Sequence, residues 1–573
     1  MSGFIAPEIA WGALTPVLVV LLAAVAGVLV EAFVPAARRR VVQLALTLGA
    51  LAGALVAVAA LWSGVERTGG TDVLSGSLVV DGPALVLQAT VALLALLSTL
   101  VVADRLDGGE DAFAPSAAAV PGSDYEELAR RTGLQQTEVF PLLLFATGGM
   151  MIFPATTDLL TLFVALEVLS LPLYLLSGMA RRRRLLSQEA SMKYFLLGAF
   201  MSAVMLFGIA LLYGYSGSLR FADIAAATAT PSGTEGLLVV GALLLIAGLL
   251  FKVGAVPFHM WTPDVYQGAP TPVTGFMAAC TKVAAFGALV RVVYAMLPGM
   301  AWDLEVVLWV VAIATMVVGT VAALVQTDVK RLLAYSSVAH AGFVLTGVVA
   351  LDDAGITAVL FYLLAYGAAT VGAFGLVSLV REQGTGDDDA PTLLGEATRL
   401  PQWAGLGRTH PVVAVTFTLF LLSFAGIPLT AGFVGKFTVF SAAVEGGAWP
   451  LALVGVLASA AAAFFYVRVI VLMFFTAPHD AELDAVDGDA GADVARDGSG
   501  PSVTSVAAGV ATSVEDPAAP VVTAELARPS TTVAAGEGLT VVAVAVCAVL
   551  TVLLGVAPSP VLDAIASVAV LLP

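Results

Sequence analysis

The stretch that decides the fold runs from Leu237 to Arg291 and reads LLVVGALLLIAGLLFKVGAVPFHMWTPDVYQGAPTPVTGFMAACTKVAAFGALVR. Two apolar segments meet there at a break rich in proline and glycine. Each segment carries one lysine, Lys252 or Lys282, with apolar residues on both sides. A charge at the centre of a bilayer costs about 2.5–3.5 kcal/mol on insertion scales, so such residues are rare and usually line a polar pathway. The stretch therefore predicts ion or proton movement within a membrane.

The break between the two segments contains six residues that interrupt helices: Gly254, Pro257, Pro263, Gly268, Pro270 and Pro272. Backbone groups freed at such a break cannot face lipid, because lipid offers them no hydrogen-bond partners. Interrupted helices beside ionisable groups are how membrane transporters build ion sites. We therefore expect the break to be buried in protein or to line a hydrated cavity.

The composition is that of a membrane protein. Of 573 residues, 59% are hydrophobic and only 12% are charged, whereas soluble domains have about 25% charged residues. Uncharged apolar runs of about 20 residues indicate membrane helices. The sequence predicts an all-α polytopic membrane protein with about fourteen spanning helices, two of them broken.

The same composition excludes several classes of function. The net charge of −17 argues against nucleic-acid binding. The two cysteines, Cys280 and Cys547, lie in separate apolar runs, which excludes a cysteine-held iron–sulfur cluster or zinc ribbon within this chain. Four scattered histidines offer no metal-ligand spacing, and no dinucleotide-binding glycine motif follows a strand. We expect no cofactor and no metal in this chain.

The apolar runs divide the chain into six parts: an N-terminal three-helix segment (1–103), a polar insert (104–137), helices 4–8 (138–302), helices 9–13 (303–476), an acidic segment (477–536) and a last helix (537–573). The acidic segment holds ten acids and two bases. Such a composition cannot bury enough apolar area to fold alone, so we expect this segment to be largely disordered.

The distribution of basic residues predicts the orientation. With the N-terminus outside, seventeen of the twenty-five lysines and arginines fall in inside loops and only Arg67 and Arg220 fall in outside loops. Cytoplasmic loops carry such an excess of bases. Both termini are therefore expected outside the inner membrane of a bacterium, with the acidic segment in the cytoplasm.

Four charged residues lie inside the predicted helices: Glu167, Lys252, Lys282 and Lys436. Exposed to lipid they would together cost about 10–14 kcal/mol, which is comparable to the net stability of a domain. One acid and three bases cannot all pair among themselves, although structural ion pairing remains an alternative for some of them. Buried lysine can release a proton, whereas arginine cannot. The set therefore predicts a proton relay in which Lys252 gains or loses a proton as its distance from Glu167 changes.

Other polar residues in the helices are weaker candidates. His259, beside the break, is either a proton carrier or a polar plug, and His340 is a second candidate carrier. Arg291 and Arg468 lie nearer helix ends, where long basic side chains usually reach the membrane surface.

An internal repeat links the two halves of the chain. LLFKVGAVPF (249–258) and LLSFAGIPLT (421–430) share a Leu-Leu pair, a stretch of small residues and a proline, with Pro257 matching Pro428. Paired broken helices in two halves of a transporter indicate repeat-related ion sites.

These segments resemble a known family. The stretch from Phe251 to Arg291, together with VKRLLAYSSVAHAGF (329–343) and GIPLTAGFVGKF (426–437), is similar to the subunit N family of proton-translocating NADH–quinone oxidoreductase, or respiratory complex I. The resemblance covers about Glu138 to Thr476. Related antiporter-like subunits typically have Leu-Pro-Asp-Ala where this chain has Thr262-Pro263-Asp264-Val265, which favours subunit N.

The resemblance implies fourteen helices with two inverted five-helix repeats. It also implies that Glu167 and Lys252 form a charge-paired gate, that Lys282 is the central relay and that Lys436 is the exit-side residue. The partners implied are other membrane-arm subunits, with NADH, FMN, iron–sulfur clusters and quinone bound elsewhere in the complex. The alternatives are a cation–proton antiporter subunit and the equivalent subunit of a membrane-bound hydrogenase.

Overall fold

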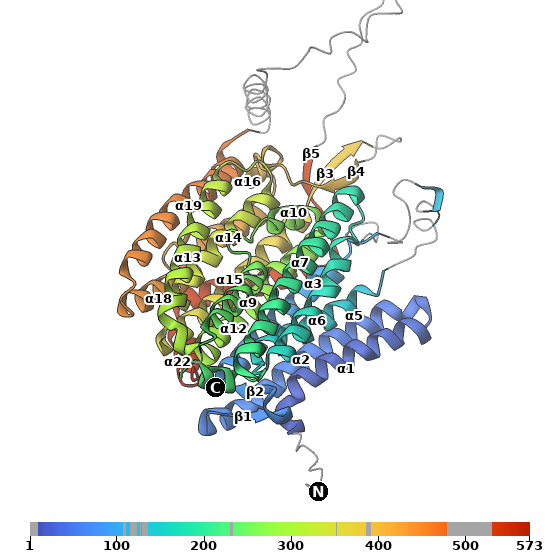
Figure 1. Cartoon of the computed structure of the whole chain (residues 1–573). Helices are drawn as coiled ribbons and strands as arrows, with labels where there is room; N and C mark the ends of the chain where they lie inside the picture. Colours follow the sequence, from blue (N-terminus) through green and yellow to red (C-terminus); the bar gives the residue numbers. More distant parts are fainter. Residues whose placement is uncertain are drawn as a thin grey trace, which may run out of the picture.

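The structure is a computed structural model that describes residues 10–572 except 107–110, 115–122, 126–127, 129–135, 230–232, 351, 386–390 and 478–529. Long helices packed side by side make up most of it (Figure 1). Among the described residues, eleven helices are long and apolar enough to cross a membrane. The prediction of an all-α polytopic membrane protein is confirmed.

The eleven spans are α1 (Trp11–Phe33), α2 (Ala36–Thr68), α3 (Gly82–Ala103), α6 (Leu159–Ser177), α7 (Arg184–Ser216), α9 (Glu235–Val253), the run Thr271–Met296, α13 (Ala301–Leu324), α15 (Asp353–Leu379), α19 (Trp449–Phe475) and α21 (Leu539–Val556). The predicted fourteen crossings also include α5 (Val139–Ile152), α14 (Val329–Val348) and the pair α17 (Pro411–Ala425) and α18 (Ala431–Glu445). These are shorter or more polar, and the number of crossings stays a prediction.

Two helices end at a glycine, and each is followed by a second helix after a short break. Helix α9 ends before Gly254 (φ +77°) and α17 ends before Gly426 (φ +81°). In both, the glycine N–H bonds to the carbonyl three residues earlier, and the next N–H bonds to the carbonyl five residues earlier. This is the Schellman motif, which needs a left-handed residue and therefore favours glycine. Helices α10 (Trp261–Gly268) and α18 follow the two breaks.

The two caps correct the register proposed for the internal repeat. Gly254 lies three residues before Pro257, but Gly426 lies only two residues before Pro428. Because the capping hydrogen bonds are the same in both helices, the glycines are equivalent and the prolines are not. Pairing Pro257 with Pro428 was therefore wrong by one residue, and Lys252 takes the position that Phe424 has in the second break.

The run that carries Lys282 lies at the centre of the bundle. It consists of α11 (Thr271–Phe276), a π-helical segment (Met277–Thr281), α12 (Lys282–Arg291) and a second π-helical segment (Val292–Met296). The most apolar part of this run is completely buried. The run packs against α15, which is also almost completely buried. π-Helical turns often occur at functional sites, and here one of them directly precedes Lys282.

Short strands occupy the two ends of the bundle and were not predicted. Strands β1 (Gly70–Val73) and β2 (Leu78–Asp81) form an antiparallel hairpin at the end where α22 (Ser559–Ala566) lies. At the opposite end, β3 (Val380–Thr385) pairs with β4 (Pro391–Glu396) and with β5 (Ser530–Val533), giving the order β4–β3–β5 (Figure 1). Strands of four to six residues give only a weak periodic signal.

The two polar segments of the sequence are only partly described. Most of the polar insert 104–137 falls outside the described residues, as do residues 478–529 of the acidic segment. The end of the acidic segment forms β5, antiparallel to β3. This pairing attaches the end of the acidic segment to the sheet that follows α15.

Candidate functional site

Lys252 lies in the last turn of α9 and is 2% exposed. Its Nζ has no hydrogen-bond or ion-pair partner in the part of the chain that the structure describes. The Oε1 atom of Glu167, on α6, is likewise buried without a partner there, and the two charges are within electrostatic range of each other. The structure thus places Glu167 and Lys252 in one region without joining them in an ion pair.

Lys282 begins α12, directly after the first π-helical segment, and is 4% exposed. Its Nζ donates a hydrogen bond to the backbone carbonyl of Ser337 on α14. No acidic side chain among the described residues pairs with it. A buried ammonium group held only by a carbonyl retains protons that it can exchange with a neighbour or with water.

Lys436 lies on α18 and is 4% exposed. Its Nζ donates to the carbonyls of Phe424 (2.7 Å) and Ala425 (3.2 Å) and to the Oγ of Ser459 (2.7 Å). Phe424 and Ala425 are the last residues of α17, where carbonyls lack partners within the helix and the helix dipole is negative. The second break thus creates the acceptor group that stabilises Lys436.

His340, on α14, lies within electrostatic range of both Lys282 and Lys436. Its Nδ1 is 2.7 Å from the hydroxyl of Tyr362, and its Nε2 is 3.2 Å from the hydroxyl of Tyr466. The Tyr466 hydroxyl is also hydrogen-bonded to Ser336. The structure therefore brings Lys282, from the first half of the chain, and His340 and Lys436, from the second half, into one buried polar region.

His259 has no described hydrogen bond to this region. It follows the first break, is 7% exposed, and its ring centroid is 6.4 Å from that of Tyr335. Its Nδ1 is buried and has no partner in the described part of the chain. No described hydrogen bond or ion pair joins His259 to any of the three lysines.

Arg291 does not reach the membrane surface as we expected. It is 1% exposed and forms two hydrogen bonds, of 2.9 and 2.8 Å, with the carboxylate of Asp81, which is completely buried. Its Nε also donates to the carbonyl of Pro154 (2.7 Å). The prediction failed because the position of a residue near a helix end does not show whether another segment of the chain covers that end. Here Asp81, at the end of β2, supplies the partner.

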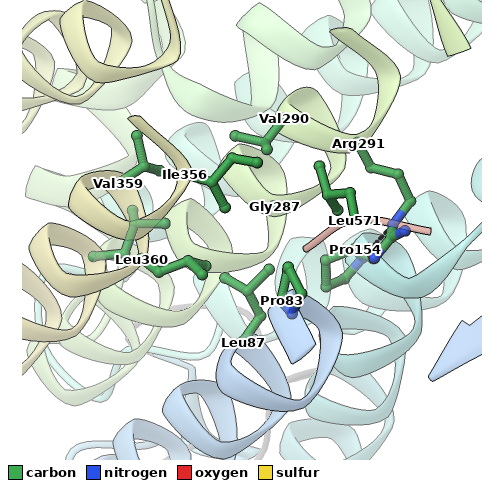
Figure 2. A pocket seen from close by; sticks show the side chains of 11 residues that line it. Pro83, Leu87, Pro154, Gly287, Val290, Arg291, Ile356, Val359, Leu360 and Leu571 are labelled. Carbon is green, nitrogen blue, oxygen red and sulfur yellow. Dashed lines mark hydrogen bonds between the residues drawn. The ribbon is translucent and has the colours of Figure 1, made fainter. Parts of the chain in front are cut away.

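Figure 2 shows Arg291 at one side of a small cavity next to this ion pair. The other residues that line the cavity are apolar: Pro83, Leu87, Pro154, Gly287, Val290, Ile356, Val359, Leu360, Leu363 and Leu571. Since its one charged side chain is already paired with Asp81, the cavity offers no free ionisable group and is not part of the candidate relay.

Sequence reasoning missed the polar residues beside the lysines and His340. These are Tyr174, Tyr194, Tyr362, Tyr466 and Ser459. A tyrosine in an otherwise apolar helix was a usable signal for Tyr362 and Tyr466, because a buried phenol usually has a polar partner. The buried hydroxyls of Tyr174 and Tyr194 have no hydrogen-bond partner in the described part of the chain. The described residues contain no group of three or more metal-ligating side chains.

Comparison with known proteins shows the family. Residues 156–461 match the family model described as NADH:quinone oxidoreductase/Mrp antiporter, TM. A protein from Beutenbergia cavernae named NADH-quinone oxidoreductase subunit N is 61% identical over 98% of both chains. A protein of the same name from Mycobacterium tuberculosis strain H37Rv is 50% identical over 97% of both chains.

Solved structures agree with this fold. A chain in respiratory complex I from Thermus thermophilus, solved with bound aureothin, is 31% identical, with a TM-score of 0.68 and coverage of 96% of this chain and 100% of that chain. A chain in the Mrp complex from a Dietzia species has a TM-score of 0.70 and covers 97% of each chain, but its 23% identity shows a shared fold alone. Together with the curated relatives, these matches show that the chain belongs to the subunit N family of NADH–quinone oxidoreductases.

Proposed function

We propose that this chain carries protons across the inner membrane of a bacterium as a membrane-arm subunit of an NADH–quinone oxidoreductase. The redox chemistry that drives it takes place in other subunits, and neighbouring antiporter-like subunits are its partners. The relay runs from Glu167 and Lys252 through Lys282 and His340 to Lys436. One observation carries the proposal: all three lysines are at most 4% exposed, and none has an ion-pair partner among the described residues.

Purely structural ion pairs do not account for these lysines. A buried charge without a counter-ion costs several kcal/mol, and burial of this kind persists in membrane proteins mainly where it serves ion movement. Lys282 and Lys436 bond to carbonyls and a hydroxyl instead of carboxylates. Such acceptors hold an ammonium group in place without neutralising it, which suits a group that must accept and release a proton.

We assign His340 the step between Lys282 and Lys436, because it lies within electrostatic range of both. It can accept a proton on one ring nitrogen and donate one from the other, and both nitrogens lie within hydrogen-bond distance of tyrosine hydroxyls. No described side-chain contact bridges Lys252 and Lys282, so this step requires water molecules between them. His259 has no described link to the relay, and we assign it the role of a polar group at the first break.

The experiment that tests the relay is redox-driven proton pumping by the whole complex carrying Lys282→Ala. We expect proton transfer through this subunit to be abolished while the complex still assembles, because the variant removes a buried charge that is costly to the fold. Lys282→Arg should also impair pumping, since arginine does not release its proton.

Cys280→Ala is the matched control for this experiment. Cys280 lies two residues before Lys282, is completely buried and carries no charge, and its replacement should leave pumping unchanged. Full pumping by an assembled Lys282→Ala complex would show that the lysine is only a structural partner, and the relay would then be rejected.

Two further features follow from the proposal. We infer that 138–302 and 303–476 are the two inverted repeats, which the identical capping of Gly254 and Gly426 supports. We also infer that both termini face the periplasm, so that the β1–β2 hairpin lies on that side and the β4–β3–β5 sheet on the cytoplasmic side. The excess of basic residues in the loops at the end of the bundle that carries the β4–β3–β5 sheet supports this orientation.

The second candidate function is a cation–proton antiporter subunit, because the matching family model names both kinds of protein. Purification in mild detergent separates the two. Chains of an NADH-oxidising complex should co-purify with this subunit, and pumping should not depend on sodium. Co-purification with antiporter subunits alone would favour the second candidate.

A further inference from the structure

Lys252 is the one relay lysine whose buried ammonium group forms no hydrogen bond among the described residues. Lys282 donates to a carbonyl and Lys436 to two carbonyls and a hydroxyl, whereas the Nζ of Lys252 has no such acceptor. A bare ammonium group at 2% exposure requires some other stabilising neighbour. Besides Glu167, which lies within electrostatic range, its neighbours are the rings of Tyr174, Tyr194 and, with the centroid 5.9 Å away, Phe251.

Two tyrosine rings face the ammonium group of Lys252. Its Nζ lies 5.3 Å from the ring centroid of Tyr174 on α6 and 5.3 Å from that of Tyr194 on α7. Attraction between a cation and an aromatic face is significant within about 6 Å of the centroid and is strongest when the cation is desolvated. The two rings meet almost at a right angle, with centroids 4.7 Å apart, and form a corner that holds the cation.

The surrounding structure fixes both rings. Tyr194 is completely buried and stacks on Trp261, with centroids 4.7 Å apart and planes 10° apart. The indole N–H of Trp261 donates to the carbonyl of Phe251 (2.9 Å), the residue before Lys252. The stack thus ties Tyr194 to the same helix end that carries the lysine.

Tyr174 is placed by its own helix and by a glycine opposite it. A Cβ at Gly198 on α7 would lie 2.1 Å from the Tyr174 hydroxyl, so only glycine leaves room for this ring. Tyr174 also follows Glu167 by seven residues on α6, which puts both on one face of that helix. Lys252 therefore has two alternative partners, the carboxylate and the aromatic corner, supplied in part by the same helix face.

We propose that Tyr174 and Tyr194 form an aromatic cage that holds protonated Lys252 whenever it is not paired with Glu167. The cage rests on the proposed relay and adds positioning residues to it. A neutral amine gains little from an aromatic face, so the cage stabilises the charged form and determines how readily Lys252 passes its proton on. The ring faces act here, and the hydroxyl groups are not required.

The test compares shape-matched variants in the whole complex, measured as proton uptake per NADH oxidised in reconstituted vesicles. Tyr174→Phe and Tyr194→Phe keep the ring faces and should pump as the unmodified complex does. Tyr174→Leu and Tyr194→Leu remove a face and should lower pumping about thirtyfold, as expected for the loss of a cation–π contact in a dry site. Fluorinated phenylalanines at position 194, which keep the ring shape but weaken the face, should lower the logarithm of the pumping rate in proportion to the number of fluorine atoms.

Phe195→Leu is the matched control for the cage. The Phe195 ring contacts Tyr174 (centroids 5.8 Å apart) but is 45% exposed and does not face Lys252, so pumping should not change. If a leucine variant fails to assemble, the fluorinated variants still test the cage, because they keep the shape of the ring.

Two results would reject the cage. A loss in the phenylalanine variants as large as in the leucine variants would assign the role to the hydroxyl groups. Normal pumping by the assembled leucine variants, in a complex that Lys282→Ala inactivates, would show that the relay works without a cage. Normal pumping by Lys282→Ala itself would instead reject the relay, so the two failures are distinguishable.

Discussion

At the scale of single residues, each buried lysine has a different kind of neighbour. Lys252 faces two tyrosine rings, Lys282 bonds to one backbone carbonyl, and Lys436 bonds to the carbonyl end of a helix and to a serine. None of these neighbours is a carboxylate. The three ammonium groups are therefore stabilised by different kinds of contact, and none of these contacts neutralises the charge.

The ion pair of Asp81 and Arg291 gives a prediction at this scale. Asp81→Asn leaves the Arg291 guanidinium buried without its counter-ion, which should destabilise the subunit by about 3–5 kcal/mol. The double variant Asp81→Asn with Arg291→Met should recover much of that loss, because no charge is then left unpaired. Thermal stability and assembly of the purified complex measure both effects.

Arg468→Met is the control for the ion-pair variants. Arg468 is exposed and makes one hydrogen bond of 3.2 Å, to the carbonyl of Leu324, so its loss should cost less than about 0.5 kcal/mol. An Asp81→Asn complex as stable as this control would mean that the pair contributes nothing to stability.

At the scale of elements, the helix breaks position the charged groups. Gly426→Ala should cost about 1–2 kcal/mol for its left-handed backbone. Its new Cβ would also lie 3.0 Å from Cδ of Lys436. Displacing the lysine by a few tenths of an ångström weakens its hydrogen bonds to the end of α17, and pumping should fall about fivefold if about 1 kcal/mol is lost.

Gly447→Ala is the matched control for this glycine. Gly447 also has a positive φ (+86°), but nothing lies within 4 Å of its added Cβ. The backbone strain is then similar while Lys436 is untouched, so pumping should stay near normal. Equal losses in both variants would mean that backbone strain alone, and not the position of Lys436, affects pumping.

The β3–β4 hairpin is attached to the central helices by Glu396. This carboxylate accepts a hydrogen bond from Thr271 (2.6 Å), the first residue of α11, and pairs with Lys330 (3.4 Å), which also donates to the carbonyl of Ala269 (2.7 Å). Burial alone would raise the pKa of Glu396, but Lys330, Arg381 and Thr271 together lower it to about 2. The hairpin therefore holds the start of the helix run that carries Lys282.

The lowered pKa predicts the pH dependence of this attachment. A carboxyl group whose pKa is lower in the folded state stabilises the fold above its ordinary value of 4.5, and the stabilisation is lost as the pH falls through the folded value. Amide exchange in β3 and β4, corrected for the slower intrinsic exchange in acid, should thus accelerate below pH 4.5 and towards pH 2. At neutral pH, Glu396→Gln should produce the same acceleration, with a loss of about 2 kcal/mol.

Glu445→Gln is the control for the exchange experiment, because Glu445 is exposed at the end of α18. It should leave the exchange of β3 and β4 unchanged. Equal exchange in the Glu396→Gln variant and in this control would show that the carboxylate does not attach the hairpin.

At the scale of the whole molecule, the two ends of the bundle should lie on opposite sides of the membrane. A cysteine introduced by Ala490→Cys, in the acidic segment, should react with an impermeant reagent only from the cytoplasmic side. The native Cys280 and Cys547 are completely buried and give no background. Labelling from outside intact cells would show that either the predicted orientation or the predicted number of crossings is wrong.

The sequence by itself determined the membrane class, the helical fold, both helix breaks and the presence of four charged residues within the helices. Each of these depends on local composition: apolar length, a left-handed glycine, or a charge among apolar neighbours. The tertiary structure decided what those charges touch. Tyr174 is 78 residues before Lys252, Ser337 is 55 residues from Lys282 and Asp81 is 210 residues from Arg291. Such contacts depend on how whole helices pack against one another, and the periodicity of a single helix carries no information about its neighbours.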